Sequence, residues 1–329
     1  MTLPRWLTIT LLCLAGLTLA LVILLRRFPH LVTLTQSPQS VLHTTSGRTN
    51  ILLLGMGGAG HEAPDLTDSL IFISLNPTTY DMVLISLPRD IWVDQLQAKI
   101  NTAYYYGQQR SPGGGLTLAK TTVSQLLGQP IHYAVGLNFS GFTRALDLVG
   151  GIDVDVPQTF DDFSFPIPGK EADPVEANRY EHLHFDAGLN HFDGATALKY
   201  VRSRNAPGDQ GTDFARSSLQ QQVIAAFKLK LFSANLITSP QRFPQLLQIF
   251  NQSVIHDLGP AELLAFSKLA MGFKSAYLRS GLFGTGTAAS PGLLLHPPVS
   301  RRYGSQWVLI PKDDRQLQEY VTNLIFAPR

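Results

Sequence analysis

The sequence predicts an α/β fold with neighbouring strands in a central sheet. Short apolar runs bounded by turn residues recur between residues 50 and 156, as expected for buried strands. Segments with apolar residues at helical spacing separate several of these runs, and this alternation is typical of α/β proteins. The 329 residues, 44% of them apolar, suffice for a sizeable core in one large domain or two small ones.

The first half of the chain supplies most of the predicted strands. Two β-rich runs, 69–75 and 82–87, flank the turn signal Asn-Pro-Thr-Thr, which predicts a hairpin or two neighbouring strands. Leu116 and Val123 recur on one side of a predicted helix. The predicted strands lie at 50–54, 69–75, 82–87, 131–137 and 152–156, and the predicted helices at 116–127 and 139–149.

The second half is predicted to be mainly helical. Residues 158–190 are charged and contain prolines, which favours a long surface excursion near a cleft. Helices are expected at 194–201 and 214–232, a broken helical stretch at 236–278, a loop at 280–300, a strand at 307–310 and a helix at 315–325. We therefore expect four parts: a tail and membrane anchor (1–30), a linker (31–47), a main domain (48–235) and a C-terminal helical extension (236–329).

The predicted membrane anchor is the run 7–25, which has 19 residues without a charge. Twelve of them are Leu, Ile or Val and favour insertion by about 4–7 kcal/mol in total. A cleaved signal peptide is the alternative, but it would end in a small-residue cleavage site, whereas Arg26-Arg27-Phe28-Pro29 follows here. Arginines flank both ends of the run, so charge alone does not fix its orientation.

Composition excludes several classes of function. A net charge of +2 does not favour nucleic-acid binding. Cys13 is the only cysteine, so the chain forms no intrachain disulfide and no cysteine-based zinc site is expected. The sequence has no G-x-S-x-G motif and therefore gives no support to a serine hydrolase.

The most distinctive stretch places three arginines within 15 residues. Arg202 and Arg204 are two residues apart, so in an extended segment they point the same way. Asp213 suits the first turn of a following helix, on which Arg216 and Gln220 share a face. Guanidinium groups match phosphate oxygens in a bidentate manner, which predicts a phosphate site. The alternative is a set of solvated surface arginines.

Two other groups of charged residues follow predicted strands. Glu62, Asp65 and Asp68 form an acidic loop whose hard oxygen ligands suit Mg²⁺ bound together with phosphate, unless the loop is simply solvated. Pro88 ends the strand at 82–87 and turns the chain, so that Arg89 and Asp90 project from the sheet edge. A local surface ion pair is the alternative for these two residues.

In this order, the motifs resemble the LytR-CpsA-Psr family of bacterial cell-envelope glycopolymer transferases. The resemblance covers roughly residues 48–232, and the arginine stretch is its most specific part. The matching stretches are NILLLG (50–55), LTDSLIFISLNP (66–77), LISLPRDIWV (84–93), KINTAYYYG (99–107), LNFSGFTRALDLVGGIDVDV (137–156), LNHFDGATALKYVRSR (189–204) and GTDFARSSLQQQ (211–222).

The resemblance implies a central mixed β-sheet flanked by helices, with a long apolar pocket that holds a polyprenyl chain. It implies transfer of a glycopolymer from a polyprenyl-pyrophosphate carrier to a sugar hydroxyl of peptidoglycan during cell-wall assembly. A short cytoplasmic tail, one anchor and an exported domain also fit the family. We therefore expect a single-pass protein of the cell membrane with its catalytic domain on the extracytoplasmic side and no nucleic-acid partner.

The resemblance also implies roles for individual residues. Four arginines and the glutamine of the motifs are implied to bind the pyrophosphate. Asp213 is implied to be a further acid of the site, and Asp68 matches an acid associated with Mg²⁺. The implied pyrophosphate ligands are Arg89, Arg202, Arg204, Arg216 and Gln220. Cleavage of a phosphoanhydride needs charge neutralisation and positioning more than a protein nucleophile. Asp90 is our candidate by position for the general base.

Two departures from the family pattern concern charged residues. Gly57-Gly58 stands where an acid followed by an arginine is usual, and Leu66 stands where a further arginine is usual. Asp65 or Glu62 could replace the missing acid. These departures keep two alternatives open: a pyrophosphohydrolase of the same carrier, and a non-catalytic module that binds polyprenyl phosphate.

Overall fold

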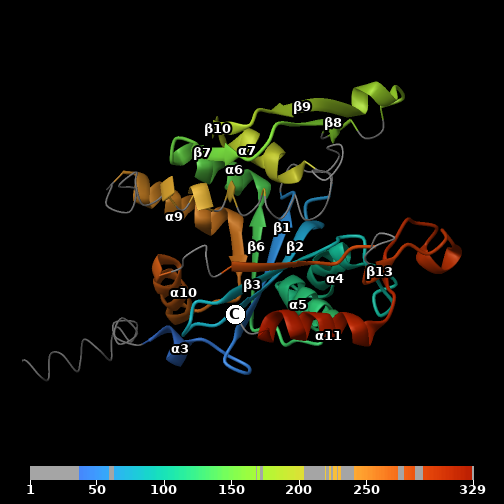
Figure 1. Ribbon diagram of the computed structural model, residues 1–329, viewed down its shortest axis with the longest axis horizontal. Helices are drawn as coiled ribbons and strands as arrows, with labels where there is room; N and C mark the ends of the chain where they lie inside the picture. The colour runs from blue at the N-terminus through green and yellow to red at the C-terminus, as the bar shows by residue number, and fades with distance from the viewer. Residues whose placement is uncertain are drawn as a thin grey trace, which may run out of the picture.

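The computed structural model describes residues 37–58, 63–167, 169–170, 173–203, 219, 222–223, 225–227, 229–230, 241–272, 278–285 and 292–327. At the centre of the described residues lies a six-stranded sheet of order β11-β6-β1-β2-β3-β12 (Figure 1). Its strands are β1 (Thr49–Met56), β2 (Thr67–Leu75), β3 (Met82–Leu87), β6 (Tyr133–Asn138), β11 (Val254–His256) and β12 (Leu278–Leu282). The pairs β1–β6 and β3–β12 are parallel and the other neighbours are antiparallel. The predicted central mixed sheet flanked by helices is therefore confirmed.

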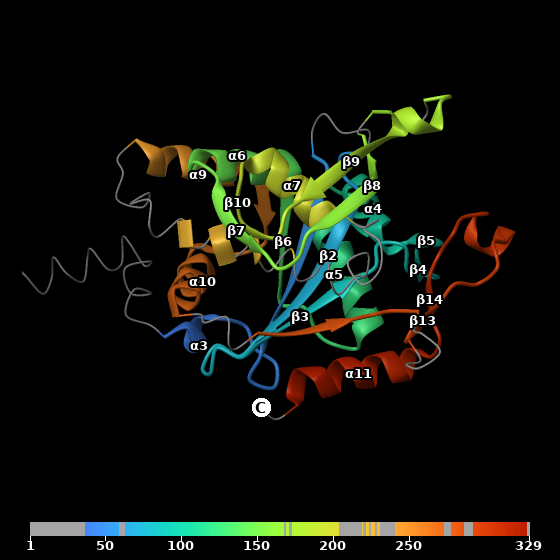
Figure 2. The same cartoon turned by 45° about the horizontal axis from the view of Figure 1, so that its top comes forward.

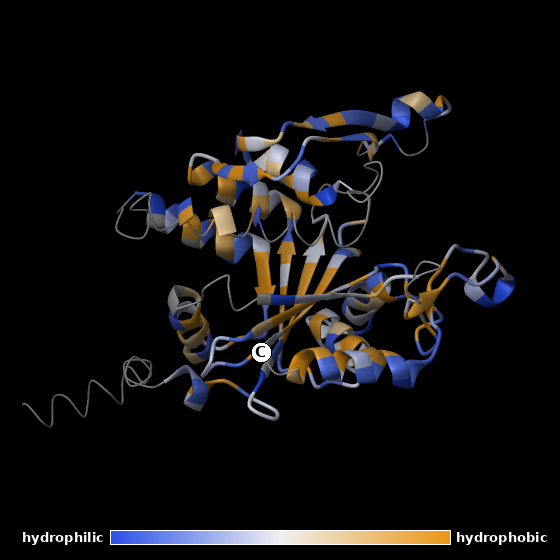
Figure 3. Cartoon of the chain, in the orientation of Figure 1, coloured by the Kyte–Doolittle hydropathy of each residue, from blue (hydrophilic) through white to orange (hydrophobic). Residues whose placement is uncertain are grey.

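The two faces of the sheet are covered to different extents. Side chains alternate along β1, so that Leu52 and Leu54 are fully buried on one face and Leu53 is half-buried on the other. The buried face packs against α4 (Ala103–Arg110), α5 (Gly114–Leu127) and α11 (Asp314–Phe326). The other face packs against α10 (Pro260–Gly272) and α3 (Pro38–Val41). Figure 3 shows the apolar character of the central strands between these layers.

A second core lies beyond one end of the sheet, at the top of Figure 1. There α6 (Phe139–Leu148) and α7 (Gly194–Arg202) pack under two antiparallel strand pairs, as the turned view of Figure 2 also shows. The pairs are β7 (Ile152–Val156) with β10 (Gly188–Phe192), and β8 (Phe160–Pro166) with β9 (Tyr180–Phe185). About half of the excursion predicted at 158–190 is therefore strand, and the rings of Phe160 and Phe185 are buried against Tyr200.

The C-terminal region contributes strands as well as helices. The stretch 236–278, predicted to be helical, contains α9 (Arg242–Ser253) and α10, but β11 lies between them and pairs with β6. β12 runs into the predicted loop region and pairs with β3. The chain continues through β13 (Leu294–Leu295) and β14 (Ile310–Pro311) to α11. Residues C-terminal to 236 thus complete both edges of the central sheet.

The predicted anchor at 7–25 lies outside the described residues. Among the helices that are described, none combines the length and apolar character needed to cross a bilayer.

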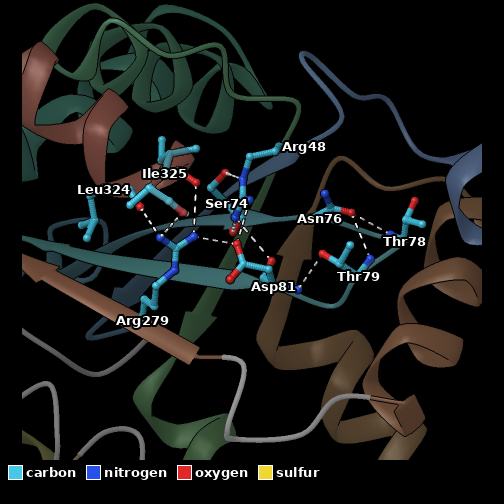
Figure 4. Close-up of polar contacts among 10 residues, drawn as sticks. Arg48, Ser74, Asn76, Thr78, Thr79, Asp81, Arg279, Leu324 and Ile325 are labelled. Atoms are coloured by element: carbon cyan, nitrogen blue, oxygen red, sulfur yellow. Dashed lines mark hydrogen bonds and ion pairs between the residues drawn. The ribbon is translucent and has the colours of Figure 1, made fainter. Parts of the chain in front are cut away.

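A buried network of charges joins the lower end of the sheet to the C-terminal helix (Figure 4). Arg48 donates from Nε to Ser74 Oγ at 2.8 Å and from Nη1 to Asp81 Oδ2 at 2.9 Å. Arg279 of β12 donates from Nη2 to the same Asp81 oxygen at 2.7 Å and from Nη1 to the carbonyl oxygen of Leu324 at 2.8 Å. Because the last carbonyl groups of a helix lack intrahelical partners, Arg279 caps α11.

The charges in this network compensate one another. Burial disfavours the ionised carboxyl of Asp81, yet hydrogen bonds from Arg279 and Arg48 outweigh burial and lower the pKa of Asp81. Burial lowers the pKa of Arg48 despite its bond to Asp81. A carboxylate removed from water with two guanidinium partners is expected to stabilise the fold only as long as all partners remain.

Candidate functional site

Several strand ends meet at the edge of the sheet opposite the Arg48 network. β1 and β6 are parallel and end together, because Met56 is paired with Asn138. β2 begins and β3 ends at the same edge, since Leu70 is paired with Leu87. Residues that directly follow or precede these strand ends are therefore brought together although they are distant in sequence.

Asp68 occupies an irregular position at the start of β2. Gly55 pairs with Ser69 and Met56 pairs with Thr67, so Asp68 is an extra residue between two pairs. Such a bulge redirects a side chain at the sheet edge. The hydroxyl of Thr67 donates to the carbonyl oxygen of Asn101 at 3.1 Å and fixes the strand beside the bulge.

Arg89 follows Pro88 at the end of β3 and points to Asp68. Its Nη1 donates to Asp68 Oδ1 at 2.5 Å, and this is the one hydrogen bond that its side chain makes to the described residues. The Nε atom is buried without a hydrogen-bond partner and lies 3.7 Å from Asp90 Oδ2. The side chain is 40% exposed. The guanidinium therefore keeps donors that a phosphate could accept from.

Asp90 belongs to a chain of ion pairs and is not an isolated carboxylate. Its Oδ1 accepts a hydrogen bond from Lys99 Nζ at 2.7 Å. Lys99 ends β5 (Ala98–Lys99), which pairs with β4 (Trp92–Val93), so this short hairpin returns Lys99 to the site. Sequence reasoning did not single out Lys99, although it starts one of the motifs that carry the resemblance.

Arg202, the last residue of α7, reaches the same edge from the second core. Its guanidinium carbon lies 4.9 Å from the ring centre of Phe139 and 5.8 Å from that of Phe165. Phe139 directly follows β6, and a Cβ atom on Gly55 would lie 3.4 Å from its ring. Arg202 is therefore held over an aromatic ring that touches the end of β1. Neither phenylalanine was predicted as part of the site.

The loop after β1 requires a glycine at one position where the sequence departs from the family pattern. Gly58 has φ of +76°, and a Cβ atom there would lie 2.7 Å from the Cβ of Asn138. The backbone next to Gly57 therefore runs close to β6 in a conformation that favours glycine.

The described residues offer little for a metal ion by themselves. Within them, no group of three His, Cys, Asp or Glu side chains is placed to hold a metal. Asp68 gives one carboxylate oxygen to Arg89, and Asp65 lies near Tyr104, whose pKa is raised by burial and then by this carboxylate. Mg²⁺ is commonly held by one or two carboxylates together with phosphate oxygens and water, and the single carboxylate of Asp68 fits that kind of binding.

The remaining predicted site residues lie outside the described part of the chain. They are Arg204, Asp213, Arg216 and Gln220. Among their described neighbours, Leu219 and Val223 are buried in the second core, and the hydroxyl of Tyr200 donates to Gln222 Oε1 at 2.7 Å.

An incompletely covered apolar surface leads up to this edge of the sheet. On the face beside α10, aliphatic side chains of neighbouring strands are paired across the sheet and remain only half-buried. They are Leu53, Ile71, Ile73, Leu84 and Val135. Gly55 lies on the same face, next to Phe139.

Comparison with known proteins places the chain in a family. The model of the LytR_cpsA_psr family matches residues 31–281. The chain is 32% identical over 209 residues to the polyisoprenyl-teichoic acid–peptidoglycan teichoic acid transferase TagU of Bacillus cereus, covering 62% of this chain and 60% of that protein. It is 32% identical over 215 residues to the corresponding TagV of Bacillus subtilis, covering 64% of this chain and 49% of that protein. The chain thus spans about half to three fifths of these relatives.

Solved structures share the fold. The crystal structure of Bacillus subtilis TagV has a TM-score of 0.54 at 24% identity and covers 87% of this chain and all of that chain. A structure of TagT bound to LIIa-WTA has a TM-score of 0.55 at 21% identity and covers 88% of this chain and 94% of that chain. Together with the match to the family model over three quarters of its length, these findings show that the chain belongs to the LytR-CpsA-Psr family.

Proposed function

We propose that this protein transfers a glycopolymer from a polyprenyl-pyrophosphate carrier to a sugar hydroxyl of peptidoglycan in cell-wall assembly. The observation that carries the proposal is the half-exposed guanidinium of Arg89, which faces Asp68 at the sheet edge and makes one hydrogen bond to the described residues. Family membership and the transferase names of the relatives support it.

The arginines would neutralise and position the pyrophosphate. In the transfer, the acceptor hydroxyl oxygen bonds to the phosphorus that carries the glycopolymer, the bond from that phosphorus to the bridging oxygen breaks, and polyprenyl phosphate leaves. Negative charge grows on the leaving phosphate, where Arg89 and Arg202 stabilise it. Arg204, Arg216 and Gln220 complete the pyrophosphate ligands by resemblance, with Asp213 as a further acid.

Asp90 is the group proposed to accept the proton of the attacking hydroxyl. The bond from Lys99 fixes its carboxylate 3.7 Å from the Arg89 guanidinium, beside the phosphate ligands. For Mg²⁺, Asp68 is the proposed protein ligand, with Asp65 as a second acid of the same loop. A bound Mg²⁺ would neutralise phosphate charge, and D68N is therefore expected to need a higher Mg²⁺ concentration for half-maximal turnover.

The polyprenyl chain is proposed to lie on the half-buried apolar face of the sheet. Leu53, Ile71 and Val135 provide aliphatic contacts on three adjacent strands. Gly55 continues this face to the ring under Arg202, so a lipid tail there would place its head group at the arginines. The predicted anchor at 7–25 would keep the domain next to the extracytoplasmic surface of the cell membrane.

The test is product analysis with a polyprenyl-pyrophosphate-linked glycopolymer, with and without peptidoglycan fragments. We expect glycopolymer on the fragments and free polyprenyl phosphate, and we expect R204A to abolish both. Unchanged turnover in R204A would refute the site assignment. Release of glycopolymer phosphate without the fragments would identify a pyrophosphohydrolase, and binding without turnover would identify a non-catalytic module.

A further inference from the structure

The β8–β9 hairpin carries two adjacent aspartates on opposite faces. Asp161 lies on the outer face, where its Oδ1 is 2.7 Å from His182 Nε2 and 2.8 Å from His184 Nδ1. Asp162 lies on the inner face and is completely buried. Its Oδ2 accepts a hydrogen bond from the hydroxyl of Ser203 at 2.7 Å, and its Oδ1 accepts one from the backbone N–H of Ser164 at 3.0 Å.

Ser203 is the direct neighbour of Arg202 and ends α7. Its side chain is buried, and its backbone N–H donates to the carbonyl oxygen of Lys199 at 2.9 Å. The hydrogen bond to Asp162 therefore fixes the backbone at the point where the chain leaves the helix. A change in this bond would move the base of the Arg202 side chain.

The same strand also contacts the guanidinium of Arg202. Phe165 follows Asp162 by three residues, across a register shift between β8 and β9. Its buried ring is centred 5.8 Å from the guanidinium carbon of Arg202, which also lies 4.9 Å from the ring centre of Phe139 in α6. β8 thus fixes Arg202 at two points, the backbone through Ser203 and the charged group through Phe165.

Attachment of the hairpin to α7 does not itself require a buried carboxylate. Lys199 Nζ already binds Glu181 Oε2 at 2.8 Å between α7 and β9, and Phe185 packs edge-on against Tyr200 in the core. Burial of a carboxyl group is costly unless its hydrogen bonds are satisfied, so a fully buried Asp162 beside the arginine stretch calls for a more specific role.

We propose that Asp162 is a positioning residue, which acts through Ser203 and together with Phe165 to direct Arg202 at the pyrophosphate of the donor. This inference rests on the proposed transferase function. In this inference the β8–β9 hairpin, which follows the family's central strands, helps to set the geometry of the phosphate site.

The test compares D162A and S203A with D161A, the matched control one residue away on the outer face. A misplacement of about 1 Å can reduce turnover about 100-fold, so we expect D162A and S203A to raise the donor KM and lower kcat/KM by about tenfold to 100-fold. D161A should keep wild-type values. The D162A/S203A double variant should lose no more than D162A alone, because D162A already breaks the hydrogen bond that S203A removes.

A merely structural role predicts a different pattern. A destabilised protein loses active fraction, so kcat per total protein falls while the donor KM stays unchanged. D162N conserves volume and can still bind the Ser203 hydroxyl, so it should fall between wild type and D162A, and it serves as the folded variant should D162A not fold. An unchanged donor KM in D162N and S203A, or multiplied losses in the double variant, would overturn the inference. Absence of transfer by the wild type would instead refute the proposed function.

Discussion

The central sheet carries an arginine–aspartate cluster at each end. The two clusters differ in whether the guanidiniums of Arg48 and Arg89 keep hydrogen-bond donors for a ligand. At the lower end, every nitrogen of Arg48 donates to Ser74 or Asp81, and both residues are buried. At the upper end, Arg89 gives one hydrogen bond to Asp68 within the described residues and remains 40% exposed. Residue type therefore does not distinguish the two clusters, whereas burial and the use of the Arg48 and Arg89 hydrogen-bond donors do.

This difference has a direct energetic meaning. A buried guanidinium whose nitrogens all donate, as in Arg48, has no capacity for a ligand, and removal of its carboxylate leaves an unpaired charge away from water. A half-exposed pair contributes little to stability, about 0–1 kcal/mol, and retains donors for an anion. The lower cluster should therefore control folding, and the upper cluster should control binding and turnover.

The largest effect on stability is expected from D81N. The substitution keeps the shape of the side chain but leaves Arg48 buried without a counter-charge, which should lower the free energy of unfolding by about 3–5 kcal/mol. Denaturant unfolding followed by circular dichroism measures this loss. A loss of less than about 1 kcal/mol would show that the lower cluster does not hold the fold together.

A smaller effect is expected from R279A. Asp81 keeps Arg48 as a partner in this variant, but α11 loses the donor to the carbonyl oxygen of Leu324. A hydrogen bond with a charged partner is worth about 1.5–3 kcal/mol, and we expect a loss in this range. Hydrogen exchange should rise first in the last turn of α11. Uniform exchange across the sheet without such a local change would contradict the capping role.

The stabilisation by Asp81 should disappear in acid. The pKa of Asp81 is lower in the folded state than in the unfolded chain, where it is about 3.9. The contribution of Asp81 to the free energy of unfolding is therefore complete above the unfolded-state pKa and is lost as the pH falls through the folded-state pKa. The difference in unfolding free energy between wild type and D81N should therefore be constant at neutral pH and shrink below about pH 4. A difference that persists unchanged in acid would exclude the charge of Asp81 as its cause.

The smallest effect concerns the outer face of the β8–β9 hairpin. Hydrogen bonds to Asp161 and Asp186 raise the pKa of His184 above its unfolded-state value of about 6.5. The contribution of His184 to stability is therefore complete below the unfolded-state pKa and is lost as the pH rises through the folded-state pKa. H184Q should lower the Tm slightly at about pH 6 and leave it unchanged at about pH 8.5, which a thermal melt at each pH measures. Equal shifts at both pH values would mean that the charge is irrelevant.

Much of the upper site follows from sequence because its residues adjoin strand ends. Strand periodicity and Pro88 place Asp68 and Arg89 at one edge, and the structure pairs them. The lower cluster was not predicted, since Arg48 and Asp81 are 33 residues apart and Asp81 and Arg279 are 198 apart, with no motif linking them. Only the strand order brings such residues together.

Two elements escaped prediction for local reasons. β11 has three residues between two helical segments, too few to show a period of two. The inner face of β8 includes the charged Asp162 between Phe160 and Phe165, and its register shift breaks the alternation that would have indicated a strand. In both cases tertiary pairing, not local pattern, determines the structure.

The most direct test of the difference between the two clusters is a paired measurement on R89A and R48A. For R89A we expect kcat/KM for transfer to fall by about 10²–10³-fold, while the free energy of unfolding changes by about 1 kcal/mol or less. In R48A, Asp81 keeps Arg279 as a partner but Ser74 and Asp81 lose their hydrogen bonds from Arg48, so we expect a loss of about 1.5–3 kcal/mol in stability and wild-type turnover per folded molecule. Wild-type turnover in R89A, or a large loss of stability in R89A with none in R48A, would contradict the assignment of binding to the upper cluster and of folding to the lower one.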